Sequence, residues 1–453
     1  MPDVQDFQKV VTRFAPSPTG LLHAGNYRTA IFSYLFARQH KGKFILRIED
    51  TDRERSKKEY EDNIVESLKW LDLEYDEFYR QSDRVAEHTA ALKKLIEKGS
   101  AYISKEEAKD GSKVMRELVR FKNPGTVISF DDLIRGTITI DTKDLGDFVI
   151  AKNINEPLFH LAVIVDDAAM GVTHIVRGED HIANTPRQLL IYDALGYPRP
   201  HYAHLPLVLD ASRAKLSKRR GALPLTYYRD EGYLPDALLN FLAMIGWNPG
   251  TEKELFTHDE LIAEFAIERI QKSGAFFNIE KLEWINKEHM KRLPPEEQCR
   301  MIGSFLPKSI TQLSGYSPLI LKKIAPLILE RITHFGEVAK MADAGELHYF
   351  FETPQYSKEK LFWKDERDAT LLLERLQGVK ERFLGLPDEH FAPETLKNAL
   401  WDYAEKEGRG QVLWPTRYAL SGRDKSPDPF QLASILGKNE TIERLNKAIE
   451  MLK

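Results

Sequence analysis

The chain is 453 residues long, carries a formal net charge of −4, and is 42% hydrophobic and 30% charged. Its length allows two or more domains, and its composition is typical of an ordinary water-soluble globular protein. The sequence has no run of 18 apolar residues that would span a membrane, and residues 1–10 lack the pattern of a secretory signal. The single cysteine, Cys299, excludes an internal disulfide and a multi-cysteine zinc cluster. We therefore expect a cytoplasmic protein with no membrane partner.

The first part of the chain has the pattern of a strand, a turn, a helix and a second strand. Residues 10–14 favour a short strand that runs into the Pro- and Gly-containing turn 15–20. Residues 44–46 favour a buried parallel strand. Between them, apolar or aromatic side chains recur at the spacing of one buried helix face, at Tyr27, Ala30, Ile31, Tyr34 and Leu35.

A second unit of this kind lies downstream. Residues 174–176 favour a strand, after which Thr185 is predicted as the N-cap of a helix that ends at Gly196. Residues 205–209 favour another strand, which leads into the basic loop 213–220. The slightly acidic net charge argues against a general nucleic-acid binder, which needs a basic field, but it leaves room for such local basic surfaces.

Between these units, strand-like pieces such as residues 137–140 predict an inserted domain within a split sheet domain. Beyond about residue 285 the pattern becomes helical, with Pro294 and Pro295 as a plausible break. Amphipathic helices are predicted in four stretches, at 317–341, 368–384, 394–406 and 440–452.

Two short segments carry the pattern of phosphate-binding sites. In the turn 16–26, a helix N-terminus presents free N–H groups, and His23 and Asn26 can donate to one phosphate. In the basic loop, Lys215 and Lys218 lie three residues apart and can reach the phosphates of one nucleotide. Each segment alone also fits a bland interpretation, namely a capped helix with a surface histidine and a solvated basic loop.

These segments resemble known signatures. PSPTGLLHAGN resembles the HIGH-type signature of class I aminoacyl-tRNA synthetases, and KLSKR resembles their KMSKS loop. RFAPSPTG, FILRIEDTD, VDDAAMGVTHIVRGEDHIANTPRQ and KLSKRRG together resemble the glutamyl-tRNA synthetases. The resemblance covers essentially the whole chain and is strongest at 11–80 and 157–290.

With this resemblance, the pattern predicts an α/β fold: a Rossmann-like parallel-sheet catalytic domain split by an inserted α+β domain, followed by an all-helical C-terminal half. The two catalytic halves are predicted at 1–96 and 166–220, and an inserted domain that binds the tRNA acceptor end at 97–165. A stem-contact region is predicted at 221–290 and a helical anticodon-binding domain at 291–453.

The resemblance implies ATP-dependent attachment of L-glutamate to tRNA(Glu) through a glutamyl-adenylate, with release of AMP and diphosphate. His23 matches the histidine that contacts ATP phosphates, Gly25 belongs to the same ATP-binding turn, and Asn26 replaces the family's second histidine. Lys218 matches the ATP-binding lysine, with Lys215 as its companion. We expect Mg²⁺ to arrive with ATP, held largely by phosphate oxygens and water and not by a protein cage. We expect no zinc, because residues 97–165 contain no cysteine.

Glutamate carries two carboxylates, which arginines can bind, and one ammonium group, which a carboxylate can bind. Arg13 and Arg177 fit the carboxylates, because a guanidinium pairs bidentately with such groups, and Glu49 fits the ammonium group. The family resemblance adds Ala15 and Ser17 to the glutamate pocket, although surface salt bridges would also explain the charged residues. One departure is Phe159, which stands where the family usually has a tyrosine whose hydroxyl reaches the substrate.

In the C-terminal half, Arg331 and Arg417 match anticodon-contacting arginines, although residues on helix surfaces would look the same. We expect tRNA(Glu) as the macromolecular partner and a monomeric chain. Four alternatives are less favoured. A synthetase that glutamylates a modified base and a small nucleotidyltransferase would not need the helical half. A glutaminyl-tRNA synthetase would usually have aspartate at Glu49, and a non-catalytic tRNA-binding protein would not need to keep the candidate site residues together.

Overall fold

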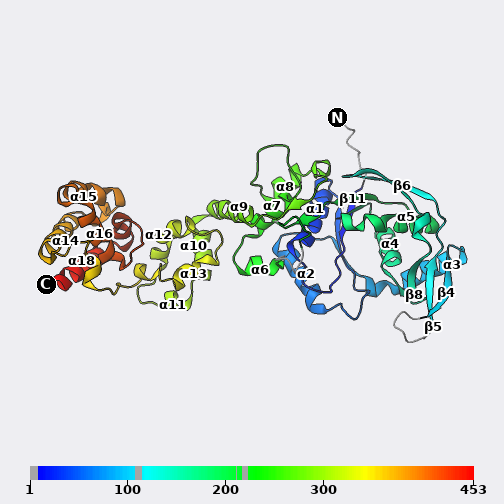
Figure 1. Ribbon diagram of the computed structural model, residues 1–453, viewed down its shortest axis with the longest axis horizontal. Coiled ribbons are helices and arrows are strands. Elements are labelled where there is room, and N and C mark those ends of the chain that lie inside the picture. The colour runs from blue at the N-terminus through cyan, green and yellow to red at the C-terminus, as the bar shows by residue number, and fades with distance from the viewer. Residues whose placement is uncertain (1–8, 108–114, 211, 217–222) are drawn as a thin grey trace. The chain divides into compact units, whose positions relative to one another are not determined.

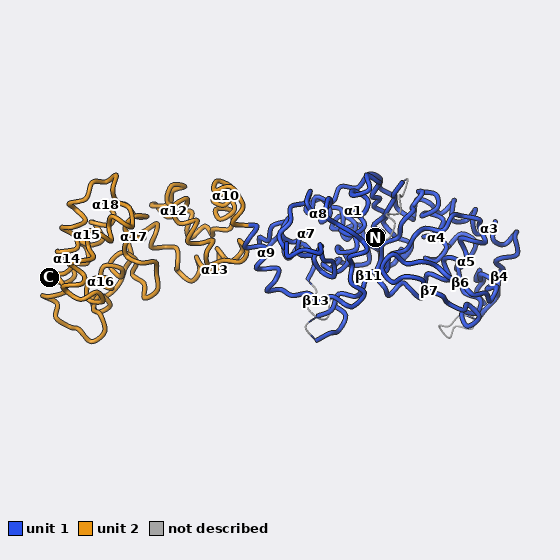
Figure 2. Tube along the Cα trace, turned by 90° about the horizontal axis from the view of Figure 1, so that it is seen from above, with its two compact units in different colours: residues 1–289 blue, residues 290–453 orange. Residues whose placement is uncertain are grey.

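The computed structural model describes residues 9–107, 115–210, 212–216 and 223–453. The chain forms two compact units, residues 1–289 and 290–453 (Figure 2). The second unit thus starts one residue before the helical domain predicted at 291. Among the described helices, none combines the length and apolar character needed to cross a bilayer.

The first half of the split sheet domain contains a parallel sheet in the order β1-β2-β3. Val11 pairs with Lys43, and Ile45 pairs with Glu77. Helix α1 packs on this sheet through an almost wholly apolar face, and the Thr12 hydroxyl donates to the Ser33 carbonyl at 2.8 Å. The predicted strands and helix are confirmed, and the elements are β1 (Val11–Phe14), α1 (Ala24–Gln39), β2 (Lys43–Ile48), α2 (Lys58–Trp70), β3 (Glu77–Arg80) and α3 (Val85–Glu97).

The second half places β10 (His174–Gly178) parallel to β11 (His201–Leu205), with α5 (Thr185–Leu195) between them in sequence. Hydrogen bonds between Val11 and Thr173 join the halves. The Thr173 N–H and hydroxyl donate to the Val11 carbonyl at 2.9 and 3.3 Å, and the Val11 N–H donates to Thr173 Oγ1 at 2.8 Å. The carboxyl ends of β1, β2 and β10 therefore lie at one edge of the fold, the edge where ligands of parallel sheets bind.

Two local predictions for this half are wrong in detail. Thr185 is not the N-cap of α5, because the 3₁₀ turn Glu179–Asn184 leads straight into the helix and Thr185 already has helical backbone angles. The predicted strand 205–209 is instead the end of β11 and a separate short strand β12 (Val208–Leu209). Pro206 explains the break, because proline has no N–H with which to continue a ladder.

The inserted segment contributes to two sheets (Figure 1). Four of its strands form an antiparallel sheet in the order β4-β5-β8-β9, and the β6–β7 hairpin instead joins β11, where Asp132 pairs with Tyr202. The segment ends in α4 (Phe159–Ala169). Its strands are β4 (Ala101–Glu107), β5 (Met115–Phe121), β6 (Val127–Asp132), β7 (Gly136–Asp141), β8 (Phe148–Asn153) and β9 (Glu156–Pro157).

The remainder of the first unit is mainly helical, although β12 pairs in parallel with β13 near the basic loop. Its elements are α6 (Leu225–Asp230), α7 (Pro235–Met244), α8 (His258–Glu264), β13 (Ala275–Phe276) and α9 (Ile279–Arg292), the last of which continues into the second unit.

The second unit consists of helices in the part of it that the structure describes. The predicted break at Pro294 and Pro295 falls between the end of α9 at Arg292 and the start of the next helix at Pro295. The predicted stretch 317–341 is interrupted at 330–336. Fully buried Arg444 ties the unit together by donating to the carbonyls of Tyr349 and Leu420, both at 2.6 Å. The helices are α10 (Pro295–Phe305), α11 (Lys308–Thr311), α12 (Pro318–Leu329), α13 (Glu337–Asp343), α14 (Ala369–Leu384), α15 (Pro393–Glu407), α16 (Arg409–Ser421), α17 (Pro429–Leu436) and α18 (Lys438–Leu452).

Candidate active site

A cavity of about 420 Å³ lies at the carboxyl edge of the parallel strands in the first unit. Its lining includes every residue predicted for the catalytic centre that the structure describes, together with Phe159: Arg13, Ala15, Ser17, His23, Gly25, Asn26, Glu49, Arg177 and Lys215. Lys218, the other predicted residue, lies outside the described residues. Segments far apart in sequence thus converge on one site, as a ligand-binding centre requires.

The N-terminus of α1 forms one end of this cavity. The Asn26 side chain accepts a hydrogen bond from the His23 backbone N–H at 3.1 Å, so it shapes the start of the helix. A Cβ atom on Gly25 would lie 3.1 Å from two atoms of the His23 ring, so the glycine lets that ring lie close to the first turn. The first turn carries no acidic residue. The helix dipole and open N–H groups therefore favour an anion such as a phosphate.

The preceding turn is held in place by backbone hydrogen bonds to two later segments. The Glu49 N–H donates to the Pro16 carbonyl at 2.9 Å, and the Lys57 N–H donates to the Pro18 carbonyl at 3.0 Å. Because Glu49 follows β2, the turn and the end of that strand are fixed to each other. The candidate phosphate site and the carboxylate of Glu49 consequently belong to one rigid edge.

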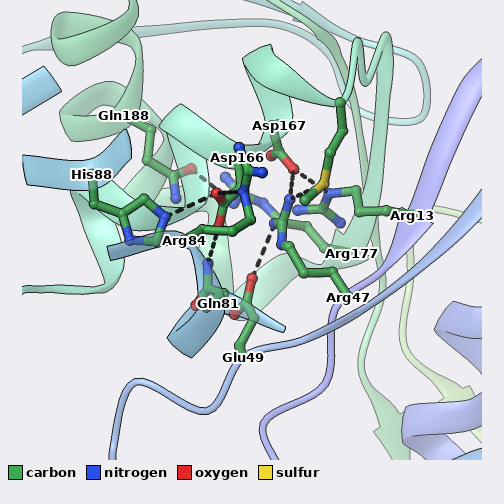
Figure 3. Close-up of polar contacts among 11 residues, drawn as sticks. Arg13, Arg47, Glu49, Gln81, Arg84, His88, Asp166, Asp167, Arg177 and Gln188 are labelled. Carbon is green, nitrogen blue, oxygen red and sulfur yellow. Dashed lines mark hydrogen bonds and ion pairs between the residues drawn. The ribbon is translucent and has the colours of Figure 1, made fainter. Parts of the chain in front are cut away.

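A chain of four buried charges runs along the wall formed by β1, β2 and α4 (Figure 3). Asp167 Oδ1 accepts from Arg13 Nε at 3.2 Å and from Arg47 Nη1 at 2.6 Å. Arg47, which is fully buried, also donates to Glu49 Oε1 at 3.1 Å. Two guanidinium groups and two carboxylates balance one another, which offsets the cost of burying each charge.

The environment of Glu49 shifts its proton affinity. Burial raises the pKa of the Glu49 carboxyl above its ordinary value, and the positive charges of Arg47 and Arg13 oppose that rise. Burial alone would lower the pKa of Arg47, but Asp167 and Glu49 raise it above its ordinary value, so Arg47 stays charged. The wall therefore offers a carboxylate whose ionisation depends on the neighbouring guanidinium groups.

Arg177 lies on the wall formed by β10 and has a different environment. Its guanidinium donates to Gln188 Oε1 at 2.8 Å, to Thr185 Oγ1 at 2.7 Å and to His204 Nε2 at 3.2 Å. It makes no ion pair with any residue that the structure describes. Burial lowers the pKa of Arg177 to about 10, so it remains a cation at neutral pH. A buried cation held by neutral groups at the edge of a cavity is suited to an anionic ligand.

Comparisons with known proteins agree with this geometry. The family model described as tRNA synthetases class I (E and Q), catalytic domain, matches residues 9–110 and 103–284, and the anticodon binding domain model matches 275–449. The glutamate–tRNA ligase of Aquifex aeolicus is 41% identical, covering 98% of this chain and 99% of that protein. The enzyme of the same name from Thermodesulfovibrio yellowstonii is 39% identical, covering 97% and 99%. A crystal structure of a glutamate tRNA ligase from Elizabethkingia meningosepticum, in complex with its amino acid, superimposes with a TM-score of 0.86 at 32% identity, covering 98% and 100%.

The chain belongs to the glutamate–tRNA ligase family of class I synthetases. This membership confirms the predicted family and the predicted fold class, including the helical C-terminal half.

In this glutamate–tRNA ligase family member, Phe159 forms part of the cavity wall at the start of α4. Its ring centroid lies 5.5 Å from that of His160 and 6.1 Å from that of His181. Burial lowers the pKa of each of these histidines to about 4, so both are neutral near pH 7. The Phe159 ring and the two histidines therefore bring no charge to the wall at this point.

Lys215 lies at the mouth of the cavity, where its ammonium group contacts Asp180 Oδ2 at 2.9 Å. Burial raises the pKa of Asp180, but the hydrogen bond and the positive charge of Lys215, with smaller contributions from His181 and the backbone, together hold the pKa below its ordinary value. The Lys215 side chain is 55% exposed. An exposed ion pair of this kind is weak, so the lysine can exchange its carboxylate partner for a phosphate at little cost.

The two predicted tRNA-binding arginines have different surroundings. Arg331 pairs with Glu346 and lines a second cavity of about 560 Å³, together with Arg423 and Lys425. Arg417 is not part of that lining; it lies 4.8 Å from the Trp414 ring centroid and donates to the Asp424 carbonyl at 2.8 Å. Asp424 belongs to the cavity wall, so Arg417 supports a pocket that Arg331 faces.

Several site residues were not identified from the sequence. Arg47 and Asp167 complete the buried charge chain, and Thr185, Gln188 and His204 hold Arg177. The only available signal was the resemblance of FILRIEDTD and of the long segment from 165 to 188, which contain four of the five. Across the residues that the structure describes, no group of three or more His, Cys, Asp or Glu side chains is arranged to hold a metal ion.

Proposed function

We propose that the cavity of the first unit binds glutamate and ATP next to each other, and that the two react there before glutamate passes to tRNA(Glu). As a member of its family, the chain is a glutamate–tRNA ligase. What we propose is which residues bind the two substrates. It is supported by one observation above all. A helix N-terminus suited to phosphate and three charged groups suited to an amino acid, on Arg13, Glu49 and Arg177, line one cavity.

In this proposal the two arginines, Arg13 and Arg177, bind the carboxylates of glutamate, and Glu49 binds its ammonium group. Ala15 and Ser17 line the cavity beside them. Glutamine would leave a buried guanidinium without its anion, which costs about 3–5 kcal/mol. Aspartate is one methylene shorter, a difference of about 1–3 kcal/mol. The charge of the substrate would thus decide selectivity more strongly than its length.

ATP would lie with its phosphates at the N-terminus of α1, beside His23, Gly25 and Asn26. Lys215 and Lys218 would complete the phosphate site, the latter by the resemblance of its loop. Mg²⁺ would enter with ATP, because phosphate oxygens and water can supply its ligands. An oxygen of the substrate α-carboxylate would attack the α-phosphate, form the mixed anhydride and displace diphosphate. Catalysis would consist mainly of positioning and charge stabilisation.

The glutamyl group would then pass to a hydroxyl of the terminal adenosine of tRNA(Glu), with AMP as the leaving group. The helical unit would bind the anticodon at the cavity that Arg331 lines, and Arg417 would hold the wall of that cavity. If Arg331 reads the anticodon, glutamate anticodons should be preferred over glutamine ones. We propose that the chain acts in the cytoplasm as a monomer.

The test is to incubate the full chain with ATP, glutamate and purified tRNAs and to measure charged tRNA. We expect charging of tRNA(Glu) that depends on ATP, with a preference for glutamate over glutamine. A nucleotidyltransferase would consume ATP without tRNA, and a base-glutamylating enzyme would modify tRNA away from its 3′ end. Failure to charge any tRNA would reject the proposal.

A further inference from the structure

The guanidinium of Arg177 is connected to a buried histidine and a buried aspartate from other elements. We infer that Asp132 and His204 are a positioning pair that orients Arg177 for glutamate. The inference rests on the proposed role of Arg177 in binding glutamate. Neither residue lines the cavity, so the pair would act through the arginine.

The contact between Asp132 and His204 joins two neighbouring strands. Asp132 ends β6 and His204 lies on β11, and both side chains are buried, with His204 at 0% exposure. Asp132 Oδ2 accepts from the backbone N–H of His204 at 3.0 Å and from the His204 ring Nδ1 at 2.6 Å. The imidazole is therefore held from two points, through its own backbone and through its ring.

These contacts decide which ring nitrogen carries the proton. The carboxylate of Asp132 can only accept, so Nδ1 of His204 must donate, which leaves a lone pair on Nε2. Nε2 lies 3.2 Å from Arg177 Nε, and Thr185 Oγ1 lies 3.1 Å from the same ring nitrogen. The opposite tautomer would place two N–H groups against each other. Burial lowers the pKa of His204 in spite of the carboxylate, so the ring stays neutral and able to accept.

The pair fixes the direction of the guanidinium. Three of its five N–H groups are used, by His204, Thr185 and Gln188. The two that remain, one on each terminal nitrogen, are available to a carboxylate. Gln188 and Thr185 both belong to α5, whereas His204 brings in a second element that is itself anchored on the β6–β7 hairpin. The guanidinium is therefore held from two elements, and its orientation does not depend on α5 alone.

The hairpin is anchored on its other side as well. Asp132 Oδ1 accepts from the backbone N–H groups of Ile134 and Arg135 at 3.0 and 2.8 Å. Arg135 in turn pairs with Glu179, just beyond the end of β10. The carboxylate of Asp132 thus has four donors, and its position is set by the turn of the hairpin as much as by the histidine.

Two substitutions of His204 distinguish a role in orienting Arg177 from a role in packing alone. His204→Asn can still reach Asp132 but ends short of Arg177, whereas His204→Gln can place a carbonyl oxygen near the position of Nε2. For His204→Asn we expect the KM for glutamate to rise about 10- to 100-fold, the usual effect of losing a hydrogen bond to a charged group. The KM values for ATP and tRNA should stay within about twofold, because their sites do not include Arg177. His204→Gln should recover most of the loss.

Each outcome decides the matter. Equal defects in the Asn and Gln variants, or KM values for ATP and glutamate that rise together, would mean that His204 only fills space and would overturn the inference. Asp132→Asn is a second test of the pair, and it can be used if His204→Asn does not fold. A carboxamide has one acceptor for four donors, so we expect a glutamate-specific rise of about 3- to 10-fold; no rise would overturn the inference. Arg177→Met is the reference: if it leaves the KM for glutamate unchanged, the proposed role of Arg177 fails instead.

Discussion

The two walls of the candidate active-site cavity hold their arginines in opposite ways. On the wall of β1, β2 and α4, Arg13 and Arg47 share the carboxylate of Asp167, and the charges cancel. On the wall of β10, Arg177 is surrounded by neutral acceptors and keeps its charge uncompensated within the described residues. The charges of the first wall are balanced within the protein, whereas the charge of Arg177 is left for an anionic ligand to balance in the proposed function. A pocket built in this way combines a rigid frame with a strong preference for a negatively charged ligand.

The largest effect should follow from breaking the balanced wall. Asp167→Ala leaves two buried guanidinium groups without their shared anion, so we expect the free energy of unfolding to fall by about 3–5 kcal/mol. Urea denaturation of the full chain, followed by tryptophan fluorescence, measures this. Gln188→Ala on the other wall is the matched control and should cost about 1–3 kcal/mol, the penalty for one lost polar partner. Equal losses in the two variants would contradict the contrast between the walls.

Removing the uncompensated charge should affect activity more than stability. For Arg177→Met we expect kcat/KM for glutamate to fall by at least about 100-fold, since a buried partner of a carboxylate is lost. The free energy of unfolding should fall less than in Asp167→Ala, because no opposite charge is left unpaired. Steady-state tRNA charging and urea denaturation of the same preparations test both statements. An unfolding loss as large as that of Asp167→Ala would show that Arg177 has a structural counter-ion.

Acid should weaken glutamate binding through the balanced wall. Burial raises the pKa of Glu49, and only its ionised form can pair with an ammonium group. As pH falls through that raised pKa, the KM for glutamate should rise, by up to about tenfold per pH unit. For folding the sign is opposite: a raised folded pKa makes the contribution of Glu49 present at low pH and lost as pH rises through it. Glu49→Gln should flatten the KM profile, and an unchanged slope in that variant would exclude Glu49 as the titrating group.

The smallest effect should come from Phe159, whose ring has no polar group to offer the ligand. Phe159→Tyr adds a hydroxyl at the cavity, and one hydrogen bond contributes about 1 kcal/mol. We therefore expect the KM for glutamate to fall by up to about fivefold, with little change for ATP. Phe159→Leu is the control for the ring itself and should not lower it. A tyrosine variant with a higher KM than the parent chain would show that the hydroxyl is not accommodated.

The residues that line the site could be predicted from the sequence, but most of their hydrogen-bond partners could not. Arg13, Glu49 and Arg177 belong to recognisable segments, and they do line one cavity. The partnership of Arg47 with Asp167 spans 120 positions, and no local periodicity encodes a contact of that kind. Thr185 was assigned as an N-cap because its local pattern allows it, but tertiary structure uses its hydroxyl for Arg177. Local patterns predict strands and helices, whereas buried polar networks depend on which elements meet.

The pairing of β6 with β11 also limits how the enzyme can be shortened. The segment 97–165 looks like a module that could be cut out and exchanged between synthetases. It nevertheless supplies the β6–β7 hairpin to the sheet of β10 and β11, and Asp132 at the end of β6 accepts a hydrogen bond from the His204 ring. A miniature enzyme without the insert would have an open sheet edge and a buried histidine with no anchor. A chimera should therefore keep the β6–β7 hairpin, residues 127–141, and exchange only the antiparallel sheet of β4, β5, β8 and β9.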